Sequence, residues 1–492
     1  MASSSEKVEG LLIGGEEVPG TRGETRTLLD PATNRPLARV AVGGVDDARQ
    51  AMEVAERAFR ESNWASDDGA RRAKALFRLA GLLESEAETL ARLETRNMGK
   101  TLRESKVDLN YVVRTFEYVA GLADKLEGET IPVSGPRFDY TVREPLGVTV
   151  HIAPWNYPLL LAMRSVAPAL AAGNSVVLKP ASLTPLTALA VARLAATAGV
   201  PPGIFNVVPG NGGEIGEALV ADPRCASLSF TGSGEVGERV AAIAARRVIP
   251  TTLELGGKSP VIIFPDADLE RAAKGIAYGI FGNAGQMCWA ASRLIVHESV
   301  RAPLLERLRP IAEAMRLGPG LEEGVDMGPL VSRDQASRVL EYIEAALSEG
   351  GKVLAGGRRA PDPKLADGNF VLPTVLTDVP PASRAVREEI FGPVLATFSF
   401  TDAEEAIRIA NDTRYGLFAA LWTRDLVTAH STARRLEAGM VTVNEPPTSF
   451  PQTPFGGFKA SGLGFEQGRR VVENYTRRKN VLVHLAPPKR KG

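Results

Sequence analysis

The sequence is poor in the residues that form disulfides and bind metals: it has two cysteines and four histidines among 492 residues. Two cysteines cannot form the disulfide framework of a small secreted protein, and a reactive thiol lasts best in a reducing compartment, so we expect a cytoplasmic location. None of the histidines has metal-ligand spacing to another histidine or to a cysteine; they are His151, His297, His430 and His484. We therefore expect no metal site.

An excess of one charge and a long apolar run are also missing. Lysine and arginine number 58, and so do aspartate and glutamate, so no net field attracts nucleic acid or a membrane surface. No apolar run reaches the roughly 18 residues of a membrane span, and residues 1–7 lack the order of a secretion signal. The basic residues 489–491 fit a solvated end. We expect no nucleic-acid partner and no membrane partner.

What the sequence does contain is an alternation of short apolar runs with helical stretches, over a length that allows two or three domains. The first series of predicted strands covers residues 148–152, 175–178, 204–208 and 227–230. The second covers residues 261–264, 294–296, 417–422 and 440–443. Strand and helix in alternation predict an α/β fold with parallel sheets. Glycines at 256 and 257 mark the predicted boundary between the two series.

Several further elements are expected around these sheets. Apolar residues at helical spacing predict amphipathic helices over residues 46–60 and 70–98, the second ending at Gly99. Residues 401–404 have the pattern of a capping box at the start of a helix. Strands over 137–143 and 480–485 are expected to lie outside both cores.

A glycine-rich motif suggests a phosphate site. Residues Gly232 to Gly237 match G-x-G-x-x-G between a predicted strand and a predicted helix, where backbone N–H groups can hold a pyrophosphate. The same fingerprint expects an acid about 20 residues later on the ribose, which would be Glu254. Because several strands precede this motif, Lys179, at the end of the strand 175–178, is the better candidate for the adenosine ribose.

Cys288 is the candidate nucleophile. It lies among small residues and precedes an apolar run, and a thiol is a strong nucleophile even when only a small fraction is ionised. A buried structural cysteine fits the same pattern. From this stretch alone, both interpretations stay open.

The chain resembles the aldehyde dehydrogenase superfamily over nearly its whole length. The shared motifs, in the family's order, are Pro154 to Pro158, Gly173 to Pro180, Phe230 to Gly237, Leu253 to Lys258, Gly285 to Cys288, Glu389 to Pro393 and Pro454 to Gly457. The resemblance implies a Rossmann-type cofactor domain, an α/β catalytic domain and a small β oligomerisation element, in a homodimer or homotetramer. The implied bounds are 1–125 and 146–256 for the cofactor domain, 257–460 for the catalytic domain, and 126–145 and 475–489 for the oligomerisation element.

The family pattern also implies roles for single residues. Cys288 would attack an aldehyde carbonyl, with the Asn156 amide and the Cys288 backbone N–H holding the oxyanion. Glu254 would activate the water that hydrolyses the thioester, which makes it the base rather than a ribose ligand. The positions implied for an NAD or NADP cofactor are Lys179 and Glu389 at the riboses, Gly232, Ser233 and Gly237 at the pyrophosphate, and Trp155 and Phe391 as cleft walls.

One departure from the family pattern concerns the cofactor. Many NAD-preferring members carry a glutamate three residues after the lysine, where its carboxylate binds the 2′-hydroxyl of the adenosine ribose. Ser182 stands there in this chain. Because the repelling charge is gone and Lys179 is near, we hypothesise that NADP is accepted, and even preferred over NAD.

A second departure concerns the substrate. Arg164 matches an arginine of succinate-semialdehyde-type members, although a benzaldehyde-type group carries it too. Gly282 stands where the semialdehyde type has a second arginine. The other pocket candidates are apolar or aromatic: Tyr157, Met287, Trp289 and Phe455. An apolar or aromatic aldehyde is therefore favoured, with Arg164 in a surface ion pair at the pocket mouth. The alternative is a semialdehyde dehydrogenase that uses Arg164.

Two other classes of protein were weighed. A cysteine hydrolase or acyl transferase needs a base beside Cys288, usually histidine, and no histidine lies in these motifs. A catalytically silent relative would lack the catalytic residues, yet Cys288, Asn156 and Glu254 are all present. Both remain remote alternatives.

Overall fold

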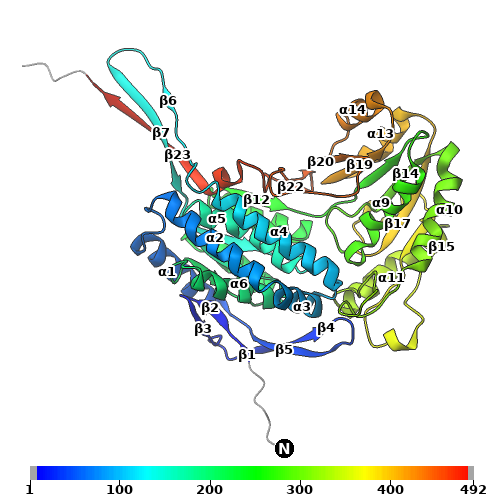
Figure 1. Ribbon diagram of the computed structural model, residues 1–492, viewed down its shortest axis with the longest axis horizontal. Helices are drawn as coiled ribbons and strands as arrows, with labels where there is room; N and C mark the ends of the chain where they lie inside the picture. The colour runs from blue at the N-terminus through cyan, green and yellow to red at the C-terminus, as the bar shows by residue number, and fades with distance from the viewer. Residues whose placement is uncertain (1–7, 486–492) are drawn as a thin grey trace, which may run out of the picture.

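The computed structural model describes residues 8–485, which fold into two large sheets with their helices and a projecting β arm (Figure 1). The expectations for residues 1–7 and 489–491 concern segments outside the described part of the chain. Within residues 8–485, no helix combines the length and the apolar character needed to cross a membrane.

The first sheet has eight strands with a parallel centre. From edge to edge these are β22 (Gly462–Leu463), β12 (Thr251–Glu254), β11 (Cys225–Thr231), β8 (Val148–Ile152), β9 (Ser175–Lys179), β10 (Phe205–Val207), β2 (Leu11–Ile13) and β3 (Glu16–Val18). The first four predicted strands are confirmed as β8, β9, β10 and β11, which pair in parallel. Because helices cover both faces, almost every residue of β8 and β9 is buried, and burial does not alternate along these strands.

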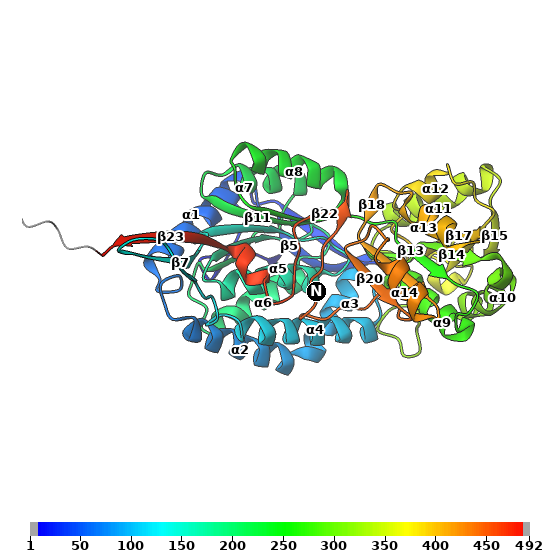
Figure 2. The same cartoon turned by 90° about the horizontal axis from the view of Figure 1, so that it is seen from above.

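Helices form a layer on each face of this sheet (Figure 2). One layer consists of α2 (Gly69–Ser85), α4 (Leu102–Ala120), α5 (Pro158–Ala171) and α6 (Leu186–Thr197). The other consists of α1 (Val45–Glu61), α7 (Gly212–Ala221) and α8 (Gly234–Arg246). The helix predicted over residues 46–60 is thereby confirmed as α1.

The single helix predicted over residues 70–98 is wrong. The chain forms α2 and then α3 (Ala87–Met98), separated at Glu86, whose ψ of 14° departs from helical geometry. The apolar stripe continues across the break, because Leu83 and Leu90 enter the same core, and the spacing alone therefore conceals the break. Gly99 ends α3 in a left-handed conformation, as predicted.

The second sheet has seven strands. In spatial order these are β15 (Lys352–Ala355), β16 (Thr374–Thr377), β17 (Val394–Phe400), β14 (Arg293–His297), β13 (Pro260–Ile263), β19 (Phe418–Trp422) and β20 (Met440–Val443). All neighbours are parallel except β15 and β16. The second series of predicted strands is confirmed as β13, β14, β19 and β20, whereas β15, β16 and β17 were not predicted.

Helices cover this sheet too, with α9 (Leu269–Phe281), α10 (Glu298–Ala314) and α11 (Arg333–Ser348) in one core and α13 (Ala403–Asn411) and α14 (Leu426–Ala433) in another. The predicted capping box is displaced by one residue. Asp402 caps α13 by accepting from the Glu405 N–H, and Glu405 in turn accepts from the backbone N–H of Thr401. Two adjacent glutamates made either register possible.

The arm is a three-stranded antiparallel sheet that projects from the first sheet (Figures 1 and 2). Its strands are β6 (Thr130–Ile131), β7 (Arg137–Pro145) and β23 (Thr476–His484). Nine residue pairs join β7 to β23, from Arg137 opposite His484 to Pro145 opposite Thr476. The strands predicted outside both cores thus pair with each other. Residues 486–489 of the predicted oligomerisation element lie beyond the described chain end.

Candidate active site

Cys288 lies where two cavities meet. A larger cavity of about 740 Å³ and a smaller one of about 180 Å³ both have Cys288 in their walls. The residue follows the short turn η1 (Gly282–Gly285) at the end of α9 and precedes β14, which anchors it in the second sheet. A substrate carbon bound to Cys288 can therefore be reached by one ligand in the large cavity and by another in the small cavity.

The structure brings most of the predicted site residues to these two cavities. The large cavity is lined by all five predicted pocket residues: Tyr157, Arg164, Met287, Trp289 and Phe455. The small cavity is lined by Asn156, Glu254, Cys288, Trp155, Gly232, Ser233, Glu389 and Phe391. Lys179, Ser182 and Gly237 line neither of the two, although all lie in the first sheet or just after one of its strands.

The turn before Cys288 has an unusual backbone. Asn283 and Ala284 have φ values of 47° and 52°, a left-handed conformation that residues other than glycine rarely adopt. Gly285 follows with φ 71°, and a Cβ there would lie 2.1 Å from the carbonyl oxygen of Gly392. Such a turn persists only where its surroundings fix it.

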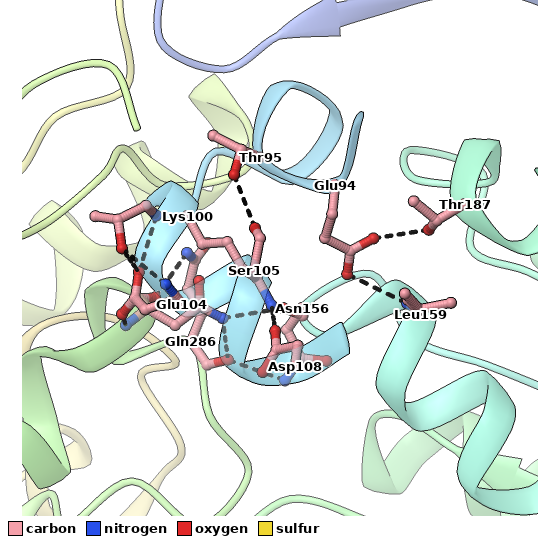
Figure 3. Close-up of polar contacts among 12 residues, drawn as sticks. Glu94, Thr95, Lys100, Glu104, Ser105, Asp108, Asn156, Leu159, Thr187 and Gln286 are labelled. Carbon is pink, nitrogen blue, oxygen red and sulfur yellow. Dashed lines mark hydrogen bonds and ion pairs between the residues drawn. The ribbon is translucent and has the colours of Figure 1, made fainter. Parts of the chain in front are cut away.

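Polar contacts fix this turn and the Asn156 amide together (Figure 3). Asn156 Nδ2 donates to the carbonyl oxygen of Gln286 at 2.9 Å, and Asn283 Nδ2 donates to the Asn156 carbonyl at 2.9 Å. Asn156 is only 2% exposed. One hydrogen of its amide is thereby oriented, and the second remains to donate to an oxygen in the cavity. This arrangement suits a donor to a developing oxyanion.

The Cys288 thiol is held in its protonated form. Burial raises the pKa of Cys288 to about 12, although the nearby Arg164 cation acts to lower it. The thiolate rather than the thiol is the nucleophile, so a base has to take this proton as a bond to sulfur forms. The chemistry therefore needs a proton acceptor beside the cysteine.

Glu254 is placed to be that acceptor. It ends β12, lines the small cavity with Cys288, and neither of its buried carboxylate oxygens has a hydrogen-bond partner among the described residues. Burial raises the pKa of Glu254 well above its ordinary value, the Glu466 carboxylate raises it further, and Arg164 opposes this. A carboxyl group with a raised pKa can take and return protons near neutral pH.

The expected surface ion pair of Arg164 is wrong. The side chain is buried, forms an ion pair through Nε with the buried Glu466, and stacks on the Phe455 ring with its central carbon 4.4 Å from the ring centroid. Its Nη2 has no hydrogen-bond partner among the described residues. Glu466 was not predicted, because nothing in the sequence marks a partner 302 residues away.

The glycine-rich motif opens α8 beside the small cavity. Ser233 is the N-cap of α8, yet its side chain does not cap the helix, so N–H groups at this end stay available to an anion. The Gly232 N–H donates to the Glu254 carbonyl at 3.0 Å, which fixes the motif next to Glu254. Gly237 packs on Leu255, where an added Cβ would lie only 2.5 Å from Leu255 Cδ2.

Lys179 and Ser182 both lie near the turn that precedes α7. The Lys179 ammonium has no hydrogen-bond or ion-pair partner within residues 8–485, and burial together with Arg26 lowers its pKa to about 8. The Ser182 hydroxyl donates to the Gly210 carbonyl at 2.6 Å. A buried cation without a partner is costly, so the Lys179 ammonium is suited to bind a ligand through its hydroxyl or phosphate oxygens.

Glu389 and two aromatic residues form the far wall of the small cavity. Glu389 accepts from the Gly257 N–H at 3.0 Å, and burial raises its pKa to about 7. Phe391 has a left-handed φ of 59° and meets Trp155 edge to face at 5.1 Å between ring centroids. Gln335 stabilises this conformation because its amide donates to the carbonyl oxygens of Ile390 and Phe391.

Several lining residues were not predicted, among them Thr231, Gln335 and Arg338 in the small cavity and Glu104, Tyr111 and Tyr278 in the large one. Asn283 and Gln286 adjoin Cys288 in sequence, and that proximity was the one available signal. Across residues 8–485, no group of three or more His, Cys, Asp or Glu side chains is arranged to hold a metal ion.

Comparison with known proteins shows that the chain is similar to aldehyde dehydrogenases. A family model described as the aldehyde dehydrogenase family matches residues 18–481. The chain is 43% identical over 477 residues to hydroxyisobutyraldehyde dehydrogenase of Mycolicibacterium austroafricanum, covering 97% of this chain and 94% of the relative. It is 43% identical over 497 residues to phenylacetaldehyde dehydrogenase of Pseudomonas fluorescens, covering 98% of each, and 41% identical over 478 residues to betaine aldehyde dehydrogenase of Bacillus subtilis (strain 168), covering 97% and 98%.

Solved structures agree. A betaine aldehyde dehydrogenase from Staphylococcus aureus in complex with NAD+ superposes with a TM-score of 0.96 at 38% identity, over 97% of this chain and 95% of that one. An NAD+ complex of aldehyde dehydrogenase from Bacillus cereus gives a TM-score of 0.95 at 41% identity, over 98% and 97%.

Proposed function

Because the chain belongs to the aldehyde dehydrogenase family, we propose that Cys288 carries the substrate covalently while Glu254 handles the protons and Asn156 the oxyanion. The protein is an oxidoreductase that oxidises aldehydes, and its cofactor is NAD or NADP. The observation that supports the proposal best is the position of Cys288 in the walls of both cavities.

The first half of the reaction forms a bond between the Cys288 sulfur and the aldehyde carbon. Glu254 takes the thiol proton, and the free N–H of the Asn156 amide donates to the carbonyl oxygen as it gains charge. A donor of this kind typically stabilises the transition state by about 3 kcal/mol. A bound nicotinamide would supply the acceptor for the hydride that leaves the substrate carbon. The substrate is then held to Cys288 as a thioester.

The second half breaks the carbon–sulfur bond. Once Glu254 has released the thiol proton to solvent, it removes a proton from a water molecule that attacks the thioester carbon, and Asn156 again donates to the oxyanion. The sulfur leaves, takes up a proton, and a carboxylic acid is released. Glu254 is suited to both halves, since its oxygens make no other hydrogen bond within the described residues.

The residues around the small cavity fit a nicotinamide dinucleotide. The uncapped N-terminus of α8 at Ser233 would hold the pyrophosphate, and the uncommitted Lys179 ammonium would bind the adenosine ribose. Glu389 would bind the nicotinamide ribose between the Trp155 and Phe391 walls. Ser182 carries no charge that would repel a 2′-phosphate near Lys179, which supports the use of NADP.

We assign an uncharged apolar or aromatic aldehyde as the substrate. At about 740 Å³ the large cavity has the size of a small-molecule site, and its aromatic wall includes Trp289, which meets Phe455 edge to face at 5.3 Å. The Arg164 charge is already compensated by Glu466, so the cavity offers a carboxylate less than a free arginine would. Two similar relatives are named for different aldehydes, phenylacetaldehyde and betaine aldehyde. The names of the relatives therefore do not identify the substrate of this chain.

A semialdehyde is the second candidate substrate. The observation that favours it is the buried Nη2 of Arg164, which has no partner within residues 8–485 and could receive one carboxylate oxygen. Gly282 supplies no second clamp at the cavity wall.

The test is NADH and NADPH formation with benzaldehyde, hexanal and succinate semialdehyde, by the unaltered protein and by Arg164→Met. We expect the highest kcat/KM with benzaldehyde or hexanal. Highest activity on succinate semialdehyde, with a selective loss of that activity in Arg164→Met, would establish the semialdehyde alternative. Cys288→Ala is the blank for both cofactors.

Domain roles and assembly are part of the proposal. The first sheet and its helices would bind the cofactor, the second sheet would present Cys288, and the arm would join subunits in a homodimer or homotetramer. The arm supports this because it leaves apolar side chains such as Phe138 and Leu482 exposed. The two cysteines are unpaired in the described chain, which fits a cytoplasmic location.

A further inference from the structure

Glu104 connects a helix of the first sheet to the turn that precedes Cys288. The residue lies in the first turn of α4 and is half-buried in the wall of the large cavity. Its Oε1 accepts from the backbone N–H of Asn283 at 2.7 Å. Its Oε2 accepts from the backbone N–H of Thr101 at 2.9 Å and from the Thr101 hydroxyl at 2.7 Å. One carboxylate thus joins two segments 179 residues apart in sequence.

The contact reaches the turn where its backbone is least favourable. Asn283 is the first of the two left-handed residues other than glycine, and its φ of 47° needs outside support. The other polar contacts of this turn come from the side-chain amides of Asn283 and Gln286 and do not involve the Asn283 N–H. A charged acceptor makes a strong hydrogen bond to a backbone N–H.

The effect continues from Asn283 to the Asn156 amide. The Asn283 side chain donates to the carbonyl oxygens of Asn156 and Gln286, and the Gln286 carbonyl in turn accepts from Asn156 Nδ2. Figure 3 shows Glu104, Gln286 and Asn156 in this chain of contacts. If the backbone of Asn283 shifts, two contacts of Asn156 shift with it: the Gln286 carbonyl that orients its side-chain amide and the Asn283 side chain that donates to its backbone carbonyl.

We propose that Glu104 is a positioning residue that acts through Asn283 and fixes the direction in which Asn156 donates to the oxyanion. This inference rests on the proposed function, in which Asn156 is that donor. Glu104 makes no bond to the reacting atoms. Its removal should therefore lower kcat, which depends on the transition state, and change the KM for the aldehyde little.

Glu104 also caps α4, and the experiment has to separate that role. Thr101→Ala removes the hydroxyl of the same capping box and its bond to Glu104 Oε2, while Oε2 keeps the Thr101 N–H and Oε1 keeps the Asn283 N–H. Thr101 lines neither cavity, so this variant is a matched control for the loss of the cap. Glu104→Ala removes both contacts, and Glu104→Gln keeps an amide oxygen that can accept from the Asn283 N–H.

The measurement is kcat and KM for the preferred aldehyde at saturating cofactor, with melting temperatures for every variant. We expect Glu104→Ala to lower kcat about tenfold to hundredfold, as small displacements of a reacting group do, with KM within about threefold. Thr101→Ala should lose a similar amount of thermal stability and keep its kcat. Glu104→Gln should recover most of the kcat, because its oxygen can still hold the turn.

A double-variant cycle with Asn156→Ala shows whether Glu104 acts through Asn156. Asn156→Ala alone should lower kcat about hundredfold or more, and adding Glu104→Ala should cost little further. Losses that multiply, a kcat of Glu104→Ala equal to that of Thr101→Ala, or a loss confined to KM would each overturn the role of Glu104. If the unaltered protein oxidises no aldehyde, the proposed function falls first, and the role of Glu104 falls with it.

Discussion

At the scale of single residues, the site depends on buried groups whose pKa values are raised. Cys288 and Glu254 both have raised pKa values, and the Arg164 cation counteracts the shift at each. The charge of Arg164 is in turn compensated by its ion pair with Glu466. Proton transfer between neighbouring buried groups, rather than a preformed thiolate, is the consequence.

The pH dependence of Cys288 alkylation tests this state directly. Because the thiol has a pKa of about 12, its thiolate fraction should rise about tenfold per pH unit from pH 7 to pH 10. The rate of alkylation by iodoacetamide in cofactor-free protein should follow, without a plateau. A Cys225→Ser background isolates Cys288, since Cys225 also has a pKa of about 12. A plateau near pH 7 would mean that a preformed thiolate exists.

The cofactor preference depends on one position, Ser182. Ser182→Glu should lower kcat/KM for NADP at least about tenfold, the effect of about 1.4 kcal/mol of repulsion between its carboxylate and the 2′-phosphate. Ser182→Gln introduces a side chain of nearly the same size as glutamate but without its charge. It should change the ratio of kcat/KM for NADP to kcat/KM for NAD much less than Ser182→Glu does. Steady-state kinetics with both cofactors decide the point. A strong NAD preference in the unaltered protein would contradict the hypothesis.

The sequence could identify the chemical groups at this scale but not most of their partners. Cys288, Glu254 and Asn156 lie in motifs and were predicted, and the structure brings them to one cavity. Glu466 pairs with Arg164 across 302 residues, and Glu104 contacts Asn283 across 179. Neither contact follows from spacing, because only the fold brings such residues together.

At the scale of elements, the start of α8 has to lie close to the end of β12. Gly237 makes this possible, since a Cβ there would lie 2.5 Å from Leu255 Cδ2, whereas a Cβ at Gly234 meets nothing within 4 Å. The two glycines are in the first turn of the same helix and differ in their surroundings alone.

Alanine at these two glycines should therefore act in opposite directions. Gly237→Ala should destabilise the cofactor-free protein by about 1–3 kcal/mol, the usual cost of overpacking, and raise the KM for the cofactor. Gly234→Ala should leave the melting temperature unchanged or raise it, because alanine favours a helix over glycine by about 1 kcal/mol. Differential scanning fluorimetry without cofactor measures both. Equal melting temperatures would contradict the close packing of α8 on β12.

Element boundaries show where sequence patterns lose information. The stripe from Leu83 to Leu90 continues across the break at Glu86, because α2 and α3 bury residues in one core. Adjacent acids at 404 and 405 left the register of the α13 cap open, and the structure selects Glu405. The buried strands β9, β13 and β14 were predictable, since each contains an unbroken run of at least three apolar residues.

At the scale of the whole molecule, the arm contributes no residue to the walls of either cavity. It presents apolar side chains to solvent: Ile131, Phe138, Leu482, Val483 and Leu485. Exposed apolar groups on a projecting sheet are typical of a surface that another subunit covers.

Charging the arm should therefore reduce the size of the assembly. We expect the unaltered protein to be a dimer or tetramer and Leu482→Glu to shift it toward smaller species. Arg478→Glu, which alters an exposed polar position on the same strand, should keep the native mass. Multi-angle light scattering after size exclusion measures the masses. A monomeric unaltered protein, or identical masses for both variants, would contradict this role of the arm.

The two-sheet architecture could be anticipated from the alternation of strands and helices, because parallel sheets produce that order. The position of Cys288 at the junction of two cavities could not, since it depends on how the second sheet is placed against the first. β15, β16 and β17 were missed although β16 pairs with the strands before and after it in the chain, so distance in sequence does not explain the omission.

The central claim is that Cys288 carries the substrate as a thioester which Glu254 helps both to form and to hydrolyse, and a burst experiment on Glu254→Gln tests it most directly. With aldehyde and cofactor in excess, this variant should form one NADH or NADPH per subunit more slowly than the unaltered protein, because Glu254 no longer takes the thiol proton, and then stop. Mass spectrometry should find the acyl group on Cys288 and none in Cys288→Ala. Continued turnover at the unaltered rate, or an acyl group absent from Cys288, would contradict the account.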